Sequence, residues 1–116
     1  MTNLKISALD YVEQIQNGNI SAEDFVSETV DRIKKVDDTL HAFLSVNDDV
    51  IEQARAIDKK IKSGDKVGAC YGMPISIKDN MCIKGSKTTC ASKMLENFVA
   101  PYDATVITKL KQQDAV

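Results

Sequence analysis

A ten-residue run in the second half of the chain constrains the fold most strongly. The run from 71 to 80 reads YGMPISIKDN, and its glycine and proline mark a turn before a short apolar stretch. Proline suits the first position of a strand, because it cannot donate a hydrogen bond further into a ladder. Alternation places Ile75 and Ile77 on one face and Lys78 on the other. The run therefore predicts a strand over residues 74–78 that ends in a lysine.

Lys78 is the candidate catalytic residue. A lysine on the inner side of such a strand end is expected to be buried or half-buried, which disfavours the ammonium form and lowers its pKa. A neutral amine at that position can act as a general base. The alternative is an ordinary lysine that reaches from the strand end into solvent. Ser76 shares the face of Lys78, but two residues along a strand are about 6–7 Å apart, so we interpret it as structural.

Three motifs together resemble the amidase signature family. The segment GMPISIKDN at 72–80 is similar to the lysine motif of that family, and TTCASK at 88–93 and PYDATV at 101–106 continue the likeness. The combination most resembles the branch formed by the glutaminase subunits of tRNA-dependent amidotransferases. The likeness is strong from about residue 40 to residue 116 and looser before that.

The resemblance implies an α/β protein, the amino-terminal portion of an amidase fold with a mixed central sheet covered by helices. Members of the family use a serine–serine–lysine triad, in which the lysine is the base and both serines lie in a later glycine- and serine-rich segment. Lys78 matches the lysine, whereas the five glycines of this sequence are scattered singly. A base without its nucleophile does no chemistry. We therefore expect residues 1–116 to be part of a single amidase domain and to be inactive alone.

The same resemblance implies a function for the parent protein. It would hydrolyse glutamine to supply ammonia for converting Glu-tRNA(Gln) to Gln-tRNA(Gln), and Asp-tRNA(Asn) to Asn-tRNA(Asn), in translation. The implied partners are a tRNA-binding kinase subunit, which uses ATP and magnesium, and a small connecting subunit; no cofactor is expected in this chain. Two alternatives remain: a general amide hydrolase of the same family, and a non-catalytic module that oligomerises through an unfinished sheet edge.

Composition restricts the location and the partners. The 116 residues are 43% hydrophobic and 28% charged, as in an ordinary globular domain. A net charge of −2 gives no basic field, so no direct contact with nucleic acid is expected. No apolar run approaches the roughly 20 residues that span a bilayer. The start, Met1–Lys5, lacks the apolar core of a signal peptide, and a cytoplasmic location is expected.

The three cysteines do not form a metal-binding pattern. Cys70, Cys82 and Cys90 contain no C-x-x-C pair, and the single histidine, His41, is far upstream. Zinc is therefore not expected, and we interpret the cysteines as buried or half-buried free thiols. Cys90 lacks a histidine nearby in the sequence, which argues against a nucleophilic role.

Hydrophobic periodicity and capping residues predict four helices, over residues 7–17, 21–36, 48–63 and 103–113. The first two begin at Ser7 and Ser21, the third is capped by Asn47 or Asp48, and the fourth by Asp103.

The apolar stretch 40–46 predicts a second strand, and residues 79–102 read as a functional or poorly ordered loop. Within that loop, Asp79 and Asn80 suit either orienting neighbouring loops or turning the chain. The stretch 88–92 suits either an active-site loop or a turn leading into a capped helix. We predict a solvated helix face from the charges on the third helix: Glu52, Arg55, Asp58, Lys59, Lys60 and Lys62.

Overall fold

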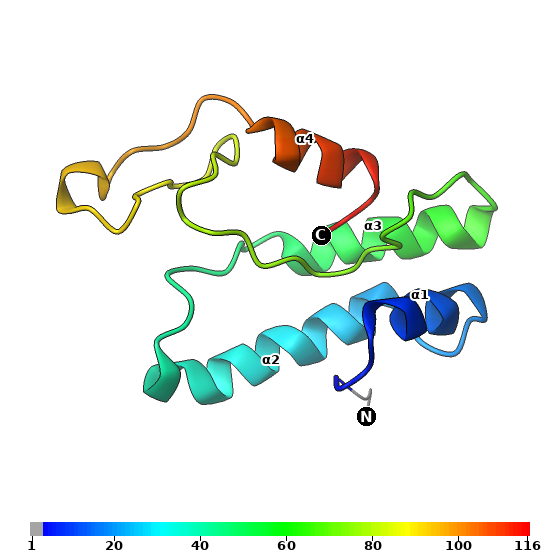
Figure 1. Cartoon of the computed structure of the whole chain (residues 1–116). Coiled ribbons are helices and arrows are strands. Elements are labelled where there is room, and N and C mark those ends of the chain that lie inside the picture. Colours follow the sequence, from blue (N-terminus) through cyan, green and yellow to red (C-terminus); the bar gives the residue numbers. More distant parts are fainter. Residues whose placement is uncertain (1–3) are drawn as a thin grey trace.

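The computed structural model describes residues 4–116; residues 1–3, on which the expectation about a signal peptide partly rests, lie outside the described residues. In chain order, the described residues form the helices α1 (Ala8–Gln16), α2 (Ala22–Leu40), α3 (Val50–Ser63), the short 3-10 helix η1 (Lys93–Leu95) and α4 (Thr105–Gln112). Figure 1 shows α1, α2 and α3 as one group of helices, with α4 on the other side of α3. No helix among residues 4–116 is both long enough and apolar enough to cross a membrane.

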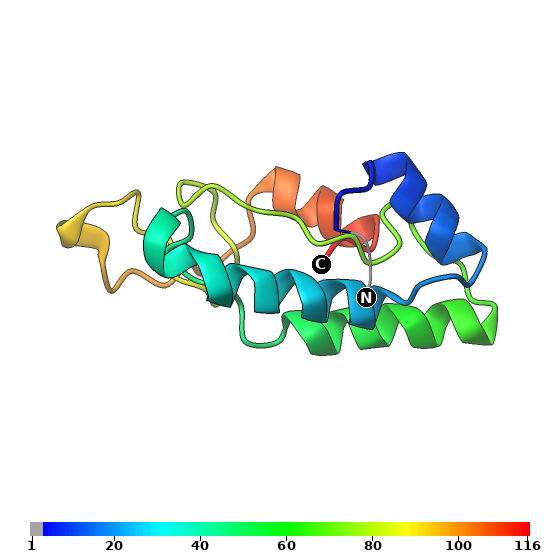
Figure 2. The same cartoon turned by 90° about the horizontal axis from the view of Figure 1, so that it is seen from below.

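The core lies where α1, α2 and α3 meet. Helices α2 and α3 run side by side in opposite directions, as both views show (Figures 1 and 2). Tyr11 and Ile15 of α1 are buried with Val26 of α2 and Ala54 of α3. The Tyr11 ring packs edge-on against Phe25, with the ring centroids 4.6 Å apart. These contacts join the three helices into a single apolar cluster.

Helix α1 begins and ends where its capping residues indicate. The Ser7 hydroxyl accepts a hydrogen bond from the Asp10 backbone N–H at 3.1 Å, and the Asp10 carboxylate accepts one from the Ser7 backbone N–H at 3.4 Å. This reciprocal pair satisfies amide groups that the helix itself leaves unpaired. At the other end, Gly18 has a φ of 70°, a left-handed conformation that glycine adopts without strain.

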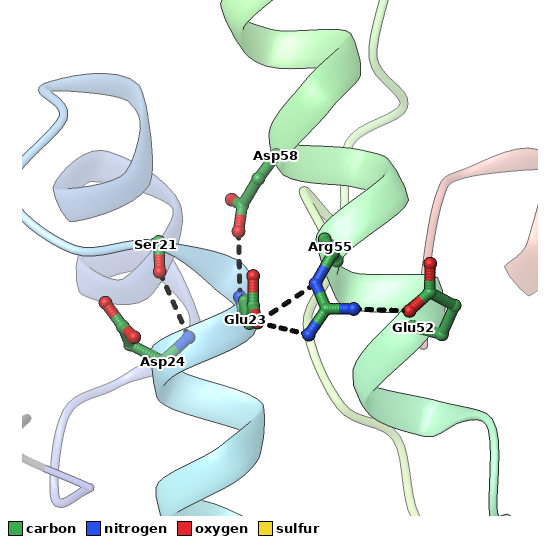
Figure 3. Close-up of polar contacts among 6 residues, drawn as sticks. All are labelled: Ser21, Glu23, Asp24, Glu52, Arg55 and Asp58. Carbon is green, nitrogen blue, oxygen red and sulfur yellow. Dashed lines mark hydrogen bonds and ion pairs between the residues drawn. The ribbon is translucent and has the colours of Figure 1, made fainter.

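Asp58 is not on the solvated face that the charge pattern of α3 predicted. It is only 9% exposed, and its carboxylate accepts hydrogen bonds from the backbone N–H groups of Ala22 and Glu23, both at 2.9 Å. Figure 3 shows the bond with Glu23. A negative charge at a helix N-terminus is favourable because the first amides have no partner within the helix. Asp58 therefore caps α2 from a neighbouring helix, which the sequence of α3 alone does not reveal.

The strand expected over residues 40–46 is absent. Helix α2 continues to Leu40, and no regular element occupies 41–49. The helix ends at its C-cap residue His41, which has a left-handed φ of 50°, and the Asp37 carboxylate accepts the next backbone N–H groups, those of Ala42 at 2.8 Å and Phe43 at 3.3 Å. A strand needs a neighbour for its backbone groups, and none lies beside this segment among the described residues.

The segment 74–78 is extended but is not a strand, so the mixed sheet expected from the resemblance is not found among residues 4–116. The Val116 backbone N–H donates to the Met73 carbonyl at 3.0 Å, and the Ile75 N–H donates to the Val116 carbonyl at 2.7 Å. One residue bonded to two residues that lie two apart is the pattern of a parallel pair. Parallel backbone pairing thus begins here, but it is limited to these two hydrogen bonds of Val116.

Asp103 does not cap α4, which begins two residues later than predicted. Its carboxylate accepts the Lys84 backbone N–H at 2.7 Å and pairs with the Lys111 ammonium at 2.8 Å. The first turn of α4 has no side-chain cap. The third helix also starts later than predicted, at Val50, and its N-cap residue Asp49 makes no side-chain cap hydrogen bond.

Candidate functional site

Lys78 stands at the end of the extended segment, on the face that alternation predicts. Ile75 and Ile77 are half-buried, whereas Ser76 and Lys78 are exposed. The alternation therefore holds, but the expected burial of Lys78 is wrong for this chain. The physical reason is that the described residues cover only one face of the segment.

A shallow groove of about 150 Å³ lies on the isoleucine face. Helix α4 contributes Ile107 and Leu110 to it, and the paired end of the chain contributes Val116. The lining residues place an apolar layer directly behind the segment that carries Lys78. This layer fixes which side chains of the segment point away from the helices.

Asp79 connects the lysine segment to the loop 88–92. Its carboxylate accepts the Thr89 backbone N–H at 2.9 Å, the Thr89 hydroxyl through a very short contact, and the Ala91 N–H at 3.5 Å. Its own backbone carbonyl accepts the Cys90 N–H at 2.8 Å. The structure shows both roles that the sequence offered for Asp79: it orients the loop, and it lies in the turn that the Met81 N–H closes on the Lys78 carbonyl at 3.0 Å. Asn80 lies exposed in the same turn.

These contacts also determine the charge of Asp79. The Thr89 hydroxyl and then the Thr89 backbone N–H lower the pKa of the Asp79 carboxyl, because both stabilise its ionised form. The group is thus held as a carboxylate that accepts hydrogen bonds.

The loop itself is framed by paired backbone on both sides. Lys87 and Val99 form an isolated antiparallel bridge, and the Thr88 N–H donates to the Phe98 carbonyl at 3.1 Å. Thr88 is 4% exposed, so it is the buried base of the loop. At its far end, the Ser92 hydroxyl accepts the Met94 N–H at 3.3 Å and caps η1. The capped-helix interpretation of 88–92 is therefore correct for Ser92.

The third motif is bonded to the same region. The Ala104 N–H donates to the Cys82 carbonyl at 2.8 Å, and Asp103 holds the Lys84 N–H as described above. The chain from 78 to 84 is thereby joined to both 88–92 and 103–104. All three sequence motifs meet in one part of the molecule, although 20 residues, 81–100, separate the first from the last.

The cysteines are free thiols, of which Cys70 and Cys82 are half-buried. Cys90 is exposed, so the expectation that all three would be at least half-buried is wrong for this residue. It lies in the 88–92 turn with a φ of 49°, in the left-handed region. Within residues 4–116, no group of three or more His, Cys, Asp or Glu side chains lies together as a metal site requires.

The family is defined by a match over most of the chain. The family described as Amidase matches residues 24–116. The chain belongs to the amidase family. Among its curated relatives are subunits A of glutamyl-tRNA(Gln) amidotransferases. The relative from Cenarchaeum symbiosum is 46% identical over 110 residues, which cover 95% of this chain and 22% of that protein. The relative from Clostridium acetobutylicum is 49% identical, covering 90% of this chain and 23% of that protein.

Solved structures agree with this assignment. A bacterial aryl acylamidase of the amidase signature family superposes with a TM-score of 0.87 at 28% identity, over 96% of this chain and 24% of that one. A protein of a vestigial complex related to the origins of an s-triazine catabolic enzyme gives a TM-score of 0.90 at 27% identity, over 96% of this chain and 25% of that one. The chain thus spans about a quarter or less of the proteins it matches.

Proposed function

We propose that this chain is the lysine-bearing amino-terminal part of a glutaminase subunit of a tRNA-dependent amidotransferase. The parent protein hydrolyses glutamine, and the released ammonia converts Glu-tRNA(Gln) to Gln-tRNA(Gln), and Asp-tRNA(Asn) to Asn-tRNA(Asn). Its partners are a tRNA-binding kinase subunit, which uses ATP and magnesium, and a small connecting subunit. The names of the two relatives described above support this proposal, because both are subunits A of glutamyl-tRNA(Gln) amidotransferases.

One structural observation carries the proposal. Asp79 joins Lys78 to the loop 88–92, and the contacts of Asp103 join the same region to the third motif. The three motifs that resemble the family are therefore held side by side rather than spread along the chain. Lys78 acts as the general base in this proposal, and the two serines of the triad belong to a segment outside these 116 residues.

The first test is complementation. The chain is mixed with a separate polypeptide that corresponds to the remainder of the Clostridium acetobutylicum relative, and ammonia release from glutamine is measured. Activity is expected only in the mixture, and Lys78→Ala should reduce it to the level of the separate pieces. Lys87→Ala is the matched control, because Lys87 is also an exposed lysine in extended backbone. A folded but inactive mixture, or full activity of Lys78→Ala, contradicts the proposal.

A second candidate is a general amide hydrolase, which the likeness to an aryl acylamidase favours. The same mixture distinguishes the two when it is given an aryl amide such as p-nitroacetanilide. Cleavage of the aryl amide without glutamine hydrolysis supports the second candidate. If neither substrate reacts and the chain self-associates, the non-catalytic module is the better account.

A further inference from the structure

Asp79 makes more contacts with the loop 88–92 than its position in a turn requires. Its carboxylate and its own carbonyl together accept three successive backbone N–H groups of the loop, those of Thr89, Cys90 and Ala91. The Thr89 hydroxyl adds a fourth contact, and it also accepts the Ala91 N–H at 3.2 Å. A single residue thus determines the position of the whole turn.

The loop needs such a restraint, because its backbone is unfavourable. Cys90 and Ala91 have φ values of 49° and 51°, and neither is a glycine. Consecutive residues with side chains rarely adopt the left-handed region, and they do so only where the surroundings hold them there. The tip of the loop is exposed, so packing does not supply this restraint. The Ser92 N–H closes the turn on the Thr89 carbonyl at 2.9 Å, and the bonds to Asp79 add a restraint from outside the turn.

Asp79 directly follows Lys78, so the loop is bonded to the residue next to the proposed base. Any shift of the loop relative to the Lys78 backbone must break at least one of the Asp79 contacts. We propose that Asp79 is a positioning residue, which fixes the loop 88–92 relative to Lys78 and so sets the distance between the base and an amide substrate that rests on the loop. This inference rests on the proposed function of Lys78.

The alternative is a purely structural role, in which Asp79 only stabilises the fold, as Asp103 does. Asp103 is also a partly exposed carboxylate, and it also accepts a backbone N–H of a loop, that of Lys84. It does not contact the loop 88–92. Asp103→Asn is therefore a matched control, because it removes a charge from an equivalent kind of anchor at a different place.

The first arm of the experiment measures amide hydrogen exchange in the chain itself. Asp79→Asn should accelerate exchange at Thr89 and Ala91, because one of the carboxylate oxygens that accept their N–H groups becomes a donor. The effect should be smaller at Cys90, whose N–H donates to the Asp79 backbone carbonyl that the substitution keeps. Asp103→Asn should leave these three amides unchanged. Unchanged protection in Asp79→Asn overturns the inference, whether or not the proposed function is correct.

The second arm measures glutamine hydrolysis by the complemented mixture. Misplacement of a bound substrate by about 1 Å can reduce turnover about 100-fold. We expect kcat, normalised to the folded fraction, to fall by about this factor in Asp79→Asn, with a much smaller change in KM. Thr89→Val should lower kcat in the same direction, whereas Thr89→Ser, which keeps the hydroxyl, should restore it.

The outcomes are distinguishable. A mixture that is inactive with the unsubstituted chain counts against the proposed function, and the exchange measurement then decides alone whether Asp79 orders the loop. Normal kcat in Asp79→Asn, or an equal loss in Asp103→Asn at equal stability, overturns the positioning role.

Discussion

Replacement of Asp58 tests the most consequential polar contact of the fold. Asp58→Ala leaves the N–H groups of Ala22 and Glu23 without their acceptor at the start of α2, and Ala22 is fully buried. Hydrogen bonds to charged groups contribute about 1.5–3 kcal/mol each. Taking the low value for each bond, because water can reach Glu23, gives a loss of about 3 kcal/mol. A domain of 116 residues has about 6–17 kcal/mol in total, so the loss is a large fraction of its stability.

Urea unfolding followed by circular dichroism measures this loss. With a urea dependence of about 2 kcal/mol per molar, the midpoint should fall by about 1.5 M. Ser21→Ala, which removes the hydroxyl that accepts the Asp24 N–H at 3.0 Å, should cost only about 1 kcal/mol. Arg55 pairs with Glu23 and Glu52 on the exposed side of the same junction, so Arg55→Ala should lower the urea midpoint only slightly (Figure 3).

Asp31→Ala is the control for removing a carboxylate as such, because Asp31 is exposed in the middle of α2. It should leave the midpoint nearly unchanged. If Asp58→Ala lies within about 0.5 kcal/mol of the unsubstituted chain, it behaves as an ordinary surface substitution and the capping argument is refuted.

Two further predictions concern backbone shape and pH. Gly72→Ala should destabilise the chain by about 2–4 kcal/mol, from left-handed strain plus overpacking, because the new Cβ lies 2.8 Å from the Ala22 Cβ. Gly64 has a similar φ, but no atom lies within 4 Å of the new Cβ, so Gly64→Ala should lose only the stability that backbone strain costs, about 1 kcal/mol. If urea unfolding gives equal losses of stability for the two variants, the contact with Ala22 does not contribute. The Lys111 ammonium and, to a smaller extent, the Lys84 N–H lower the pKa of the Asp103 carboxyl in the folded chain. The ionised carboxylate therefore stabilises the fold fully above its unfolded pKa, which is near 4, and this stabilisation is lost as the pH falls through the lower folded pKa. Urea midpoints between pH 7 and pH 3 should therefore depend less on pH in Asp103→Asn, and an unchanged dependence contradicts this assignment.

Local signals in the sequence located the helices well. The capping box at Ser7 and Asp10 and the left-handed glycines at 18 and 64 act within one or two turns of chain, so their effect depends on neighbouring residues alone. Helix ends that lack such a local signal were predicted less accurately. Helix α2 extends to Leu40 rather than ending near residue 36, and the Asp37 carboxylate accepts the backbone N–H groups of Ala42 and Phe43 just beyond that end.

Long-range contacts were outside the reach of the sequence pattern. Asp58 falls among lysines and reads as part of a solvated face, because nothing in α3 reveals that the N-terminus of α2 lies beside it. The loop-orienting role of Asp79 depends on the position of Thr89, ten residues later, which the sequence pattern does not give. The two expected strands failed for a related reason, since an extended segment becomes a strand only when a partner pairs with it.

The sequence by itself determined the family motifs, the order of the helices and the face of the extended segment on which Lys78 lies. These properties follow from residue identity and from periodicities that are local to the backbone. Only the tertiary structure decided that Asp58 caps another helix, that Lys78 is exposed in this chain and that Asp79 bonds the lysine segment to the loop 88–92. Each of these depends on which segments meet in space, and burial and hydrogen bonding are properties of that meeting rather than of a residue alone.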